Sequence, residues 1–124
     1  MKYKSILLID DDDDDQEIFT SALNELPHPA QCITLDNAAY ALEKLKKEEI
    51  VPDVIFLDLN MPVMTGQEFL TQIKSDKKLQ DIPVIILTTS SNPDTIKHTK
   101  QLGAIRFITK PSDYNEFIRI LDVM

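Results

Sequence analysis

Two uninterrupted apolar runs each end in aspartate, and this arrangement constrains the fold more than any other feature of the chain. The run Ile6–Ile9 leads directly into six consecutive aspartates, Asp10–Asp15. The run Val54–Leu57 leads directly into Asp58. Continuous apolar runs are typical of parallel strands that are covered by helices on both faces. Because ligands of open parallel sheets bind beyond the carboxyl ends of the strands, these carboxylates are expected to meet at one edge.

Strand-like and helix-like segments alternate along the whole chain. The expected strands cover residues 4–10, 30–35, 53–58, 82–88 and 105–109. The expected helices carry apolar residues at helical spacing and cover residues 14–26, 37–48, 66–75, 93–103 and 113–123. Strict alternation predicts an α/β fold, a three-layer sandwich with a five-stranded parallel sheet between helices. The length and the lack of linkers or repeats predict a single domain over residues 1–124.

The charge of the chain argues against several classes of partner. The formal net charge is -8, whereas binding to nucleic acid or to an anionic membrane surface requires clustered Lys and Arg. No apolar run has the length of a membrane span, and the N-terminus lacks the pattern of a secretory signal. We therefore expect a cytoplasmic protein that binds neither nucleic acid nor membrane.

The single cysteine, Cys32, has no partner for a disulfide or a zinc site. It lies in an apolar stretch, which favours a buried and inert thiol. His28 and His98 also have no second His or Cys at metal-ligand spacing. The candidate metal site is therefore the acidic edge of the sheet, where converging carboxylates need a hard cation such as Mg²⁺ or Ca²⁺.

Four features are expected to meet at that edge, and together they suit phosphoryl transfer. They are the acidic pair Asp10 and Asp11, then Asp58, Thr88 and Lys110. A carboxylate can attack phosphorus and form an acyl phosphate, provided that the charge of the incoming group is neutralised. A divalent cation and the Lys110 ammonium could neutralise it, and the Thr88 hydroxyl could donate a hydrogen bond.

This ordered set resembles the receiver domain of response regulators in bacterial two-component signalling, and the similarity covers essentially all 124 residues. In that family an acidic pair follows strand 1, the phosphoacceptor Asp follows strand 3, a Ser or Thr ends strand 4 and Lys-Pro follows strand 5. The further acids Asp12–Asp15 are similar to those of single-domain cyanobacterial phytochrome response regulators. The resemblance implies a flavodoxin-like strand order, 2-1-3-4-5.

The resemblance also implies roles for individual residues. Asp58 would accept the phosphoryl group of a phosphohistidine on a sensor histidine kinase or a phosphotransfer protein. Asp11 and Asp58 would bind Mg²⁺ through their side chains, Asn60 through its backbone oxygen and Asp10 through metal-bound water. Lys110 would pair with the phosphoryl oxygens. The peptide bond between Lys110 and Pro111 resembles one that is commonly cis in the family.

A conformational switch is implied as well. Thr88 would turn toward the phosphoryl group, and the rotamer of Phe107 would report its position. The fourth helix, the fifth strand and the fifth helix would then present a changed face to a downstream protein or a second copy of the chain. Candidate contacts on this face are Ile105, Tyr114 and Ile118. With no output domain, the protein would be no ordinary enzyme and would catalyse only its own phosphorylation and dephosphorylation.

Three alternatives remain open at this stage. The same fold could act as a constitutive adaptor for which phosphorylation is irrelevant. A phosphatase of the haloacid dehalogenase type also forms an aspartyl phosphate, but it needs a second acid at the position that Asn60 occupies. A flavodoxin-like nucleotide-binding module is weakly supported, because the chain has only two glycines and no phosphate-cradling loop after the first strand.

Overall fold

The computed structural model describes residues 1–124, and five parallel strands alternate in it with five helices. The strands are β1 (Ser5–Ile9), β2 (Gln31–Leu35), β3 (Val54–Leu57), β4 (Val84–Thr88) and β5 (Arg106–Thr109). The helices are α1 (Asp13–Asn24), α2 (Ala38–Lys46), α3 (Gly66–Ser75), α4 (Pro93–Gln101) and α5 (Tyr114–Asp122). The strand order is β2-β1-β3-β4-β5. The predicted architecture and strand order are confirmed.

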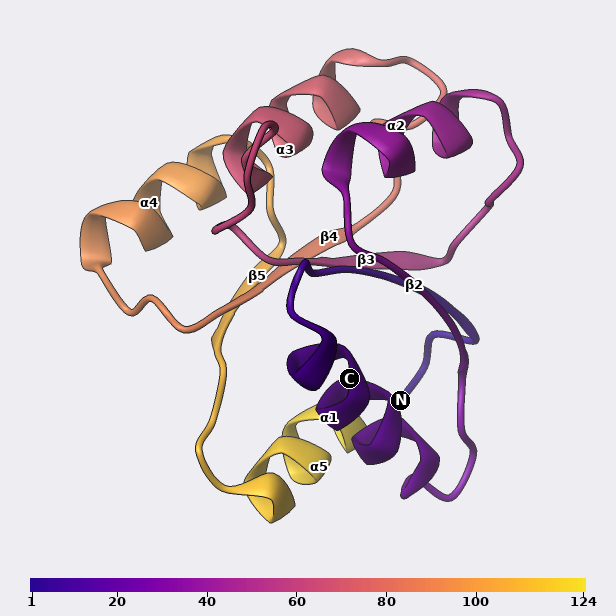
Figure 1. The fold of residues 1–124 in the computed structure, drawn as a ribbon, viewed down its shortest axis with the longest axis vertical. Helices are drawn as coiled ribbons and strands as arrows, with labels where there is room; N and C mark the ends of the chain where they lie inside the picture. The colour runs from indigo at the N-terminus through magenta and orange to yellow at the C-terminus, as the bar shows by residue number, and fades with distance from the viewer.

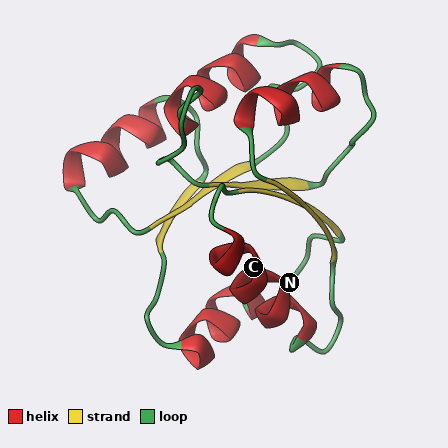
Figure 2. Cartoon of the chain, viewed as in Figure 1, coloured by secondary structure: helices red, strands yellow, loops and turns green.

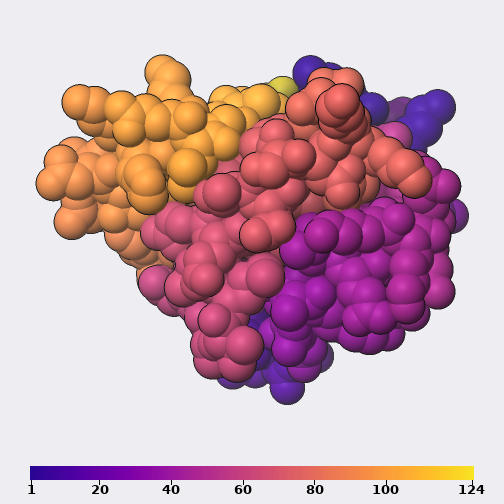
Figure 3. All heavy atoms as spheres, turned by 90° about the horizontal axis from the view of Figure 1, so that it is seen from above, coloured from indigo at the N-terminus to yellow at the C-terminus, as the bar shows by residue number.

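The sheet lies between two layers of helices. Helices α2, α3 and α4 cover one face, and α1 and α5 cover the other (Figures 1 and 2). Figure 3 looks onto the first layer, where α2, α3 and α4 lie side by side. The two chain ends meet on the opposite side, where the Lys2 backbone N–H donates a hydrogen bond to the Met124 carbonyl at 2.8 Å. No helix is both long and apolar enough to cross a membrane.

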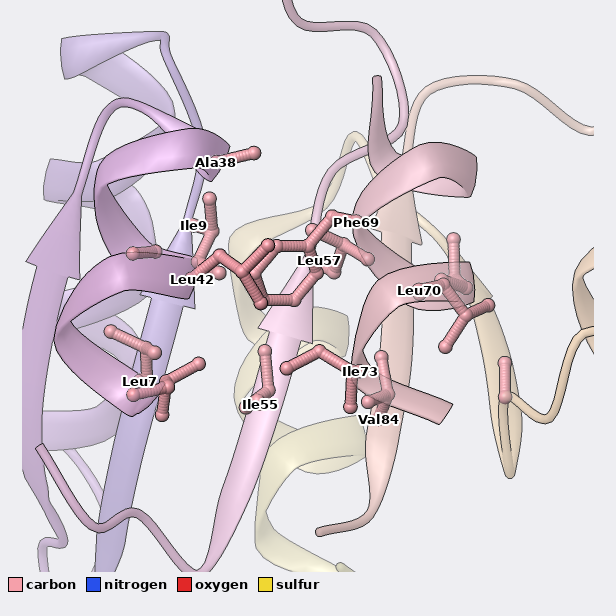
Figure 4. Close-up of a cluster of buried hydrophobic side chains, with 14 of the residues drawn as sticks. Leu7, Ile9, Ala38, Leu42, Ile55, Leu57, Phe69, Leu70, Ile73 and Val84 are labelled. Atoms are coloured by element: carbon pink, nitrogen blue, oxygen red, sulfur yellow. The ribbon is translucent and has the colours of Figure 1, made fainter. Parts of the chain in front are cut away.

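The continuous apolar strands arise because alternate side chains enter different cores. Leu7 and Ile9 of β1 pack under α2 and α3 with Phe69 (Figure 4), whereas Ile6 and Leu8 pack under α1 and α5. The side chains of β3 and β4 alternate between the two cores in the same way. Strand β2 contains more polar residues and lies at an edge of the sheet, in agreement with the expected strand order.

The acidic run is ordered by the start of α1. Asp12 is the N-cap of this helix, and its carboxylate accepts the backbone N–H groups of Asp14 and Asp15. Asp13, Asp14 and Asp15 occupy the first turn, where negative charge is favoured by the helix dipole. The extra aspartates therefore have a structural role at the helix start.

Two sequence expectations are wrong. Cys32 is only partly buried, because β2 is an edge strand and one side of it is open. The chain contains no cis peptide bond, so the bond between Lys110 and Pro111 is trans. The trans isomer is the more stable form for most bonds that precede proline.

Candidate functional site

The predicted residues converge because β1 and β3 are neighbours that end in register. Ile9 pairs with Leu57, and the Asp58 backbone N–H donates to the Ile9 carbonyl at 3.0 Å. Asp10 and Asp58 are the residues that follow these paired positions. The register of two adjacent strands thus places both carboxylates at the same edge of the sheet.

Three carboxylates form a cluster at this edge. One carboxylate oxygen from each of Asp10, Asp11 and Asp58 lies within 4.8 Å of the other two. Asp10 is 1% exposed and Asp58 6% exposed, whereas Asp11 is open to solvent. Burial raises the pKa of Asp10 above its ordinary value, although the hydrogen bond from Lys110 opposes this effect. The cluster therefore concentrates negative charge where water cannot fully solvate it.

Lys110 reaches into this cluster from the loop after β5. Its Nζ atom donates to Asp10 at 2.8 Å and to Asp15 at 2.7 Å, and it lies 3.8 Å from the nearest carboxylate oxygen of Asp58. Its side chain is 13% exposed. Burial alone would lower the pKa of Lys110, but the hydrogen bonds to Asp10 and Asp15 and the charge of Asp58 raise it above its ordinary value.

Thr88 ends β4, which lies next to β3. It is fully buried, and its hydroxyl is the one buried side-chain polar atom without a hydrogen-bond partner. Its backbone carbonyl accepts the Lys110 backbone N–H at 2.7 Å, which ties the ends of β4 and β5 together. Leaving a buried hydroxyl without a hydrogen bond costs free energy. The Thr88 hydroxyl is therefore free to form a hydrogen bond with a ligand at this edge of the sheet.

Asn60 contacts the cluster, whereas Phe107 lies beside a separate cavity. The Asn60 backbone N–H faces a carboxylate oxygen of Asp58 at 3.5 Å, and its side chain is exposed. Phe107 is in register with Ile86 of β4 and is half-buried. It lines a cavity of about 280 Å³ between α4 and β5, together with Ile96 and Ile105.

The residue that sequence reasoning did not single out is Asp15. It was one of six identical residues, and its contact with Lys110 depends on the rotation of α1 about its axis. A helical-face argument could have found it. Asp15 lies four residues before Phe19 and seven before Ala22, and both of these are buried. Such spacing places Asp15 on the inward face of α1.

The donor set fits a hard divalent cation. Asp10, Asp15 and Asp58 lie within 3.8 Å of the Lys110 ammonium, and Asp11 shares the cluster with Asp10 and Asp58, so the edge carries excess negative charge. Carboxylate oxygens are the ligands that Mg²⁺ prefers, and one or two carboxylates are enough to hold it. Asp10, Asp11 and Asp58 are the side chains that are close enough to share one ion.

Comparisons with known proteins agree with this geometry. A family model for the response regulator receiver domain matches residues 6–122. A protein-glutamate methylesterase/protein-glutamine glutaminase of Halalkalibacterium halodurans is 38% identical over 109 residues. That match covers 86% of this chain but only 30% of the relative, so the chain spans under a third of that protein's length.

Two solved structures superpose on nearly the whole chain. The phosphorylated cyanobacterial phytochrome response regulator RcpA has a TM-score of 0.88 and 33% identity, with 98% of this chain and 90% of that chain covered. The Mn²⁺-bound form of the response regulator Rcp1 has a TM-score of 0.86 and 29% identity, with 97% and 90% covered. The fold of this chain is thus shared with two response regulators, one solved in a phosphorylated form and one in a Mn²⁺-bound form.

Proposed function

This chain belongs to the family of response regulator receiver domains, and we propose that it signals by accepting a phosphoryl group on Asp58. The observation that carries the proposal is the setting of this carboxylate. Asp58 is 6% exposed at the end of β3, it shares a cluster with Asp10 and Asp11, and it lies 3.8 Å from the Lys110 ammonium. Phosphoryl transfer depends on such positioning and charge neutralisation.

The proposed donor is a phosphohistidine on a sensor histidine kinase or a phosphotransfer protein. A carboxylate oxygen of Asp58 forms a bond to phosphorus while the bond between phosphorus and the imidazole nitrogen breaks, and its electron pair stays on the imidazole. Lys110 then pairs with a phosphoryl oxygen, and the Thr88 hydroxyl donates to another. Water later attacks phosphorus, which releases inorganic phosphate and restores the carboxylate.

We propose that Asp11 and Asp58 hold Mg²⁺ with their side chains, Asn60 with its backbone oxygen and Asp10 through bound water. The ion would supply positive charge beside the phosphoryl oxygens. The fit is supported by the three carboxylate oxygens that lie within 4.8 Å of one another and by the Mn²⁺-bound form of the similar regulator Rcp1.

The proposed output is a shift between two conformations, which the phosphoryl group biases by binding one of them more tightly. The hydroxyl of Thr88 is buried and has no partner, so a phosphoryl oxygen would give it one. Phe107 would follow by changing rotamer beside its cavity. The face made by α4, β5 and α5, which exposes Ile105 and Tyr114, would then bind a downstream protein or a second copy of the chain.

On this proposal residues 1–124 form one receiver domain of a cytoplasmic signalling pathway. The domain is an acceptor and no turnover enzyme, since it catalyses only its own phosphorylation and dephosphorylation. The methylesterase relative is consistent with this assignment, because its match to the chain covers only 30% of that protein.

Labelling with acetyl phosphate and Mg²⁺, followed by intact-protein mass measurement, tests the proposal. Wild-type protein should gain one phosphoryl group, and Asp58→Asn should gain none. Asp36→Asn removes an exposed carboxylate after β2 and should label like the wild type. Equal labelling of Asp58→Asn and wild type would overturn the proposal. Sustained turnover of small phosphate esters would favour a phosphatase instead.

A further inference from the structure

The Lys110 ammonium is shared unequally among three carboxylates. It donates to Asp15 at 2.7 Å and to Asp10 at 2.8 Å, whereas its 3.8 Å separation from Asp58 is too long for a hydrogen bond. An ammonium group has three N–H donors, so two are already engaged. In this state the lysine is therefore held by Asp10 and Asp15 and faces Asp58 without bonding to it.

The contact between Asp15 and Lys110 distinguishes Asp15 from its neighbours in the acidic run. Asp13, Asp14 and Asp15 share the first turn of α1, and the helix dipole favours all three. Asp13 and Asp14 are exposed, whereas Asp15 is partly buried on the face that carries Phe19. A role at the helix start alone explains the negative charges but not the direction of the Asp15 side chain.

The apolar surroundings of the ion pair between Asp15 and Lys110 strengthen this interaction. Asp15 and Lys110 line a small cavity of about 60 Å³ together with Ile18, Leu87, Pro111 and Phe117. These neighbours are apolar and offer the ammonium no other side-chain acceptor. An ion pair in such a setting is less screened than a pair on an open surface. Moving Lys110 toward a new partner therefore requires weakening its bond to Asp15.

We propose that Asp15 is a positioning residue that holds Lys110 back from Asp58 and so weakens the pairing of Lys110 with a phosphoryl group there. The inference rests on the proposed function, because it concerns the same site. Asp15 competes for the ammonium before transfer and opposes its shift toward the phosphoryl oxygens afterwards. Its own negative charge also repels those oxygens. Both effects lower the affinity of the site for a phosphoryl group.

The test compares Asp15→Asn with Asp14→Asn, which removes the same charge from the same helical turn but touches no lysine. The probe is beryllofluoride, a mimic of the phosphoryl group, titrated at saturating Mg²⁺ and followed by ¹⁹F and amide NMR. Asp15→Asn should bind it about fivefold more tightly than wild type, the size expected for losing one charge-assisted hydrogen bond. Asp14→Asn should stay within about twofold of wild type, as an exposed charge should.

Two further measurements separate positioning from a general effect on structure. Asp15→Glu keeps the carboxylate and should return the beryllofluoride affinity to near the wild-type value. Mg²⁺ affinity without beryllofluoride, measured for each variant, shows whether the metal site itself has changed.

The outcomes distinguish the two proposals. If wild-type protein with Mg²⁺ does not bind beryllofluoride, the proposed function fails, and this inference fails with it. If wild type binds but Asp15→Asn binds no more tightly than Asp14→Asn, only the role of Asp15 is overturned. Weaker binding by Asp15→Asn at equal Mg²⁺ affinity would also overturn it, since Asp15 would then assist Lys110.

Discussion

The backbone of Gly66 lies directly against the carbonyl oxygen of Asp58. A Cβ atom at residue 66 would lie 2.5 Å from that oxygen and 2.7 Å from the Cα atom of Leu59. Both contacting atoms belong to the backbone, so no side-chain rotation can relieve the overlap. The first residue of α3 thus fixes the path of the loop that carries Asp58, and only glycine permits the approach.

Gly66→Ala should therefore disturb both stability and the site. We expect a loss of about 1–3 kcal/mol in the free energy of unfolding, as is typical of overpacking. Mg²⁺ should also bind more weakly, because the backbone of Asp58 must shift. Urea unfolding and Mg²⁺ titration measure the two effects. Gln72→Ala, at an exposed position of the same helix, is the control. If Gly66→Ala changed neither the free energy of unfolding nor the Mg²⁺ affinity, the loop that carries Asp58 would be able to move aside without cost.

Lys110 should stabilise the metal-free protein, because it offsets the charges of Asp10, Asp15 and Asp58. Lys110→Met leaves the buried Asp10 carboxylate without its cation and should cost about 2–3 kcal/mol in the free energy of unfolding. Added Mg²⁺ should restore part of this loss, since it supplies positive charge at the same place. The measurement is urea unfolding with and without Mg²⁺.

The control for this prediction is Lys47→Met, which breaks an exposed ion pair with Glu43. Exposed pairs contribute little, so its unfolding curve should nearly match that of wild type and should not depend on Mg²⁺. Equal losses for the two variants would contradict the role given to Lys110.

Mg²⁺ should stabilise the folded chain, because the proposed metal site exists only when β1 and β3 are paired. At a concentration one hundred times the dissociation constant, the gain in unfolding free energy should be about 2.7 kcal/mol. Asp11→Asn should lose most of this gain, whereas Asp13→Asn, which removes the same charge two residues later, should keep it. Thermal unfolding over a range of Mg²⁺ concentrations decides between these results.

Val63 adopts a strained backbone and contributes little packing in return. Its φ angle is +69°, a region that disfavours β-branched residues, and its side chain is 92% exposed. Val63→Gly should therefore stabilise the protein by about 0.5–1 kcal/mol in urea unfolding. Val51 is also highly exposed but has no positive φ, so Val51→Gly should have no stabilising effect. A gain for both variants would point to a cause other than backbone strain.

Cys32 should make stability depend on pH in the alkaline range. Burial raises its pKa from the ordinary value of 9.0 to about 11, despite an opposing backbone hydrogen bond. The folded state therefore retains the thiol proton at pH values where the unfolded state has lost it. Its contribution is fully present below about pH 9 and is lost as the pH rises to about 11.

The expected loss is about 2–3 kcal/mol in the free energy of unfolding between those pH values. Cys32→Ala lacks this titration, so wild type should lose more stability than the variant over the same range. Urea unfolding at a series of pH values measures the difference. Parallel curves for the two proteins would mean that the thiol titrates alike in both states.

Local patterns in the sequence were sufficient for the elements of the fold and for most of the site. The strands β1, β3 and β4 are continuous apolar runs because their side chains enter two cores, and that pattern is visible without coordinates. The positions of Asp58 and Lys110 followed from strand ends, because parallel strands share one carboxyl edge. Comparison with the receiver family then supplied roles that spacing alone does not contain.

Tertiary structure decided what identical residues do. Helical spacing distinguishes Asp15 from Asp14 by placing it on the inward face of α1, but only the packing of α1 in the fold decides that its carboxylate reaches Lys110. The exposure of Cys32 depends on the edge position of β2, and the contact of Gly66 with Asp58 depends on where α3 begins. Long-range packing sets each of these relationships, so the sequence determined the fold and its acidic edge, whereas only the folded chain determined which acid holds the lysine.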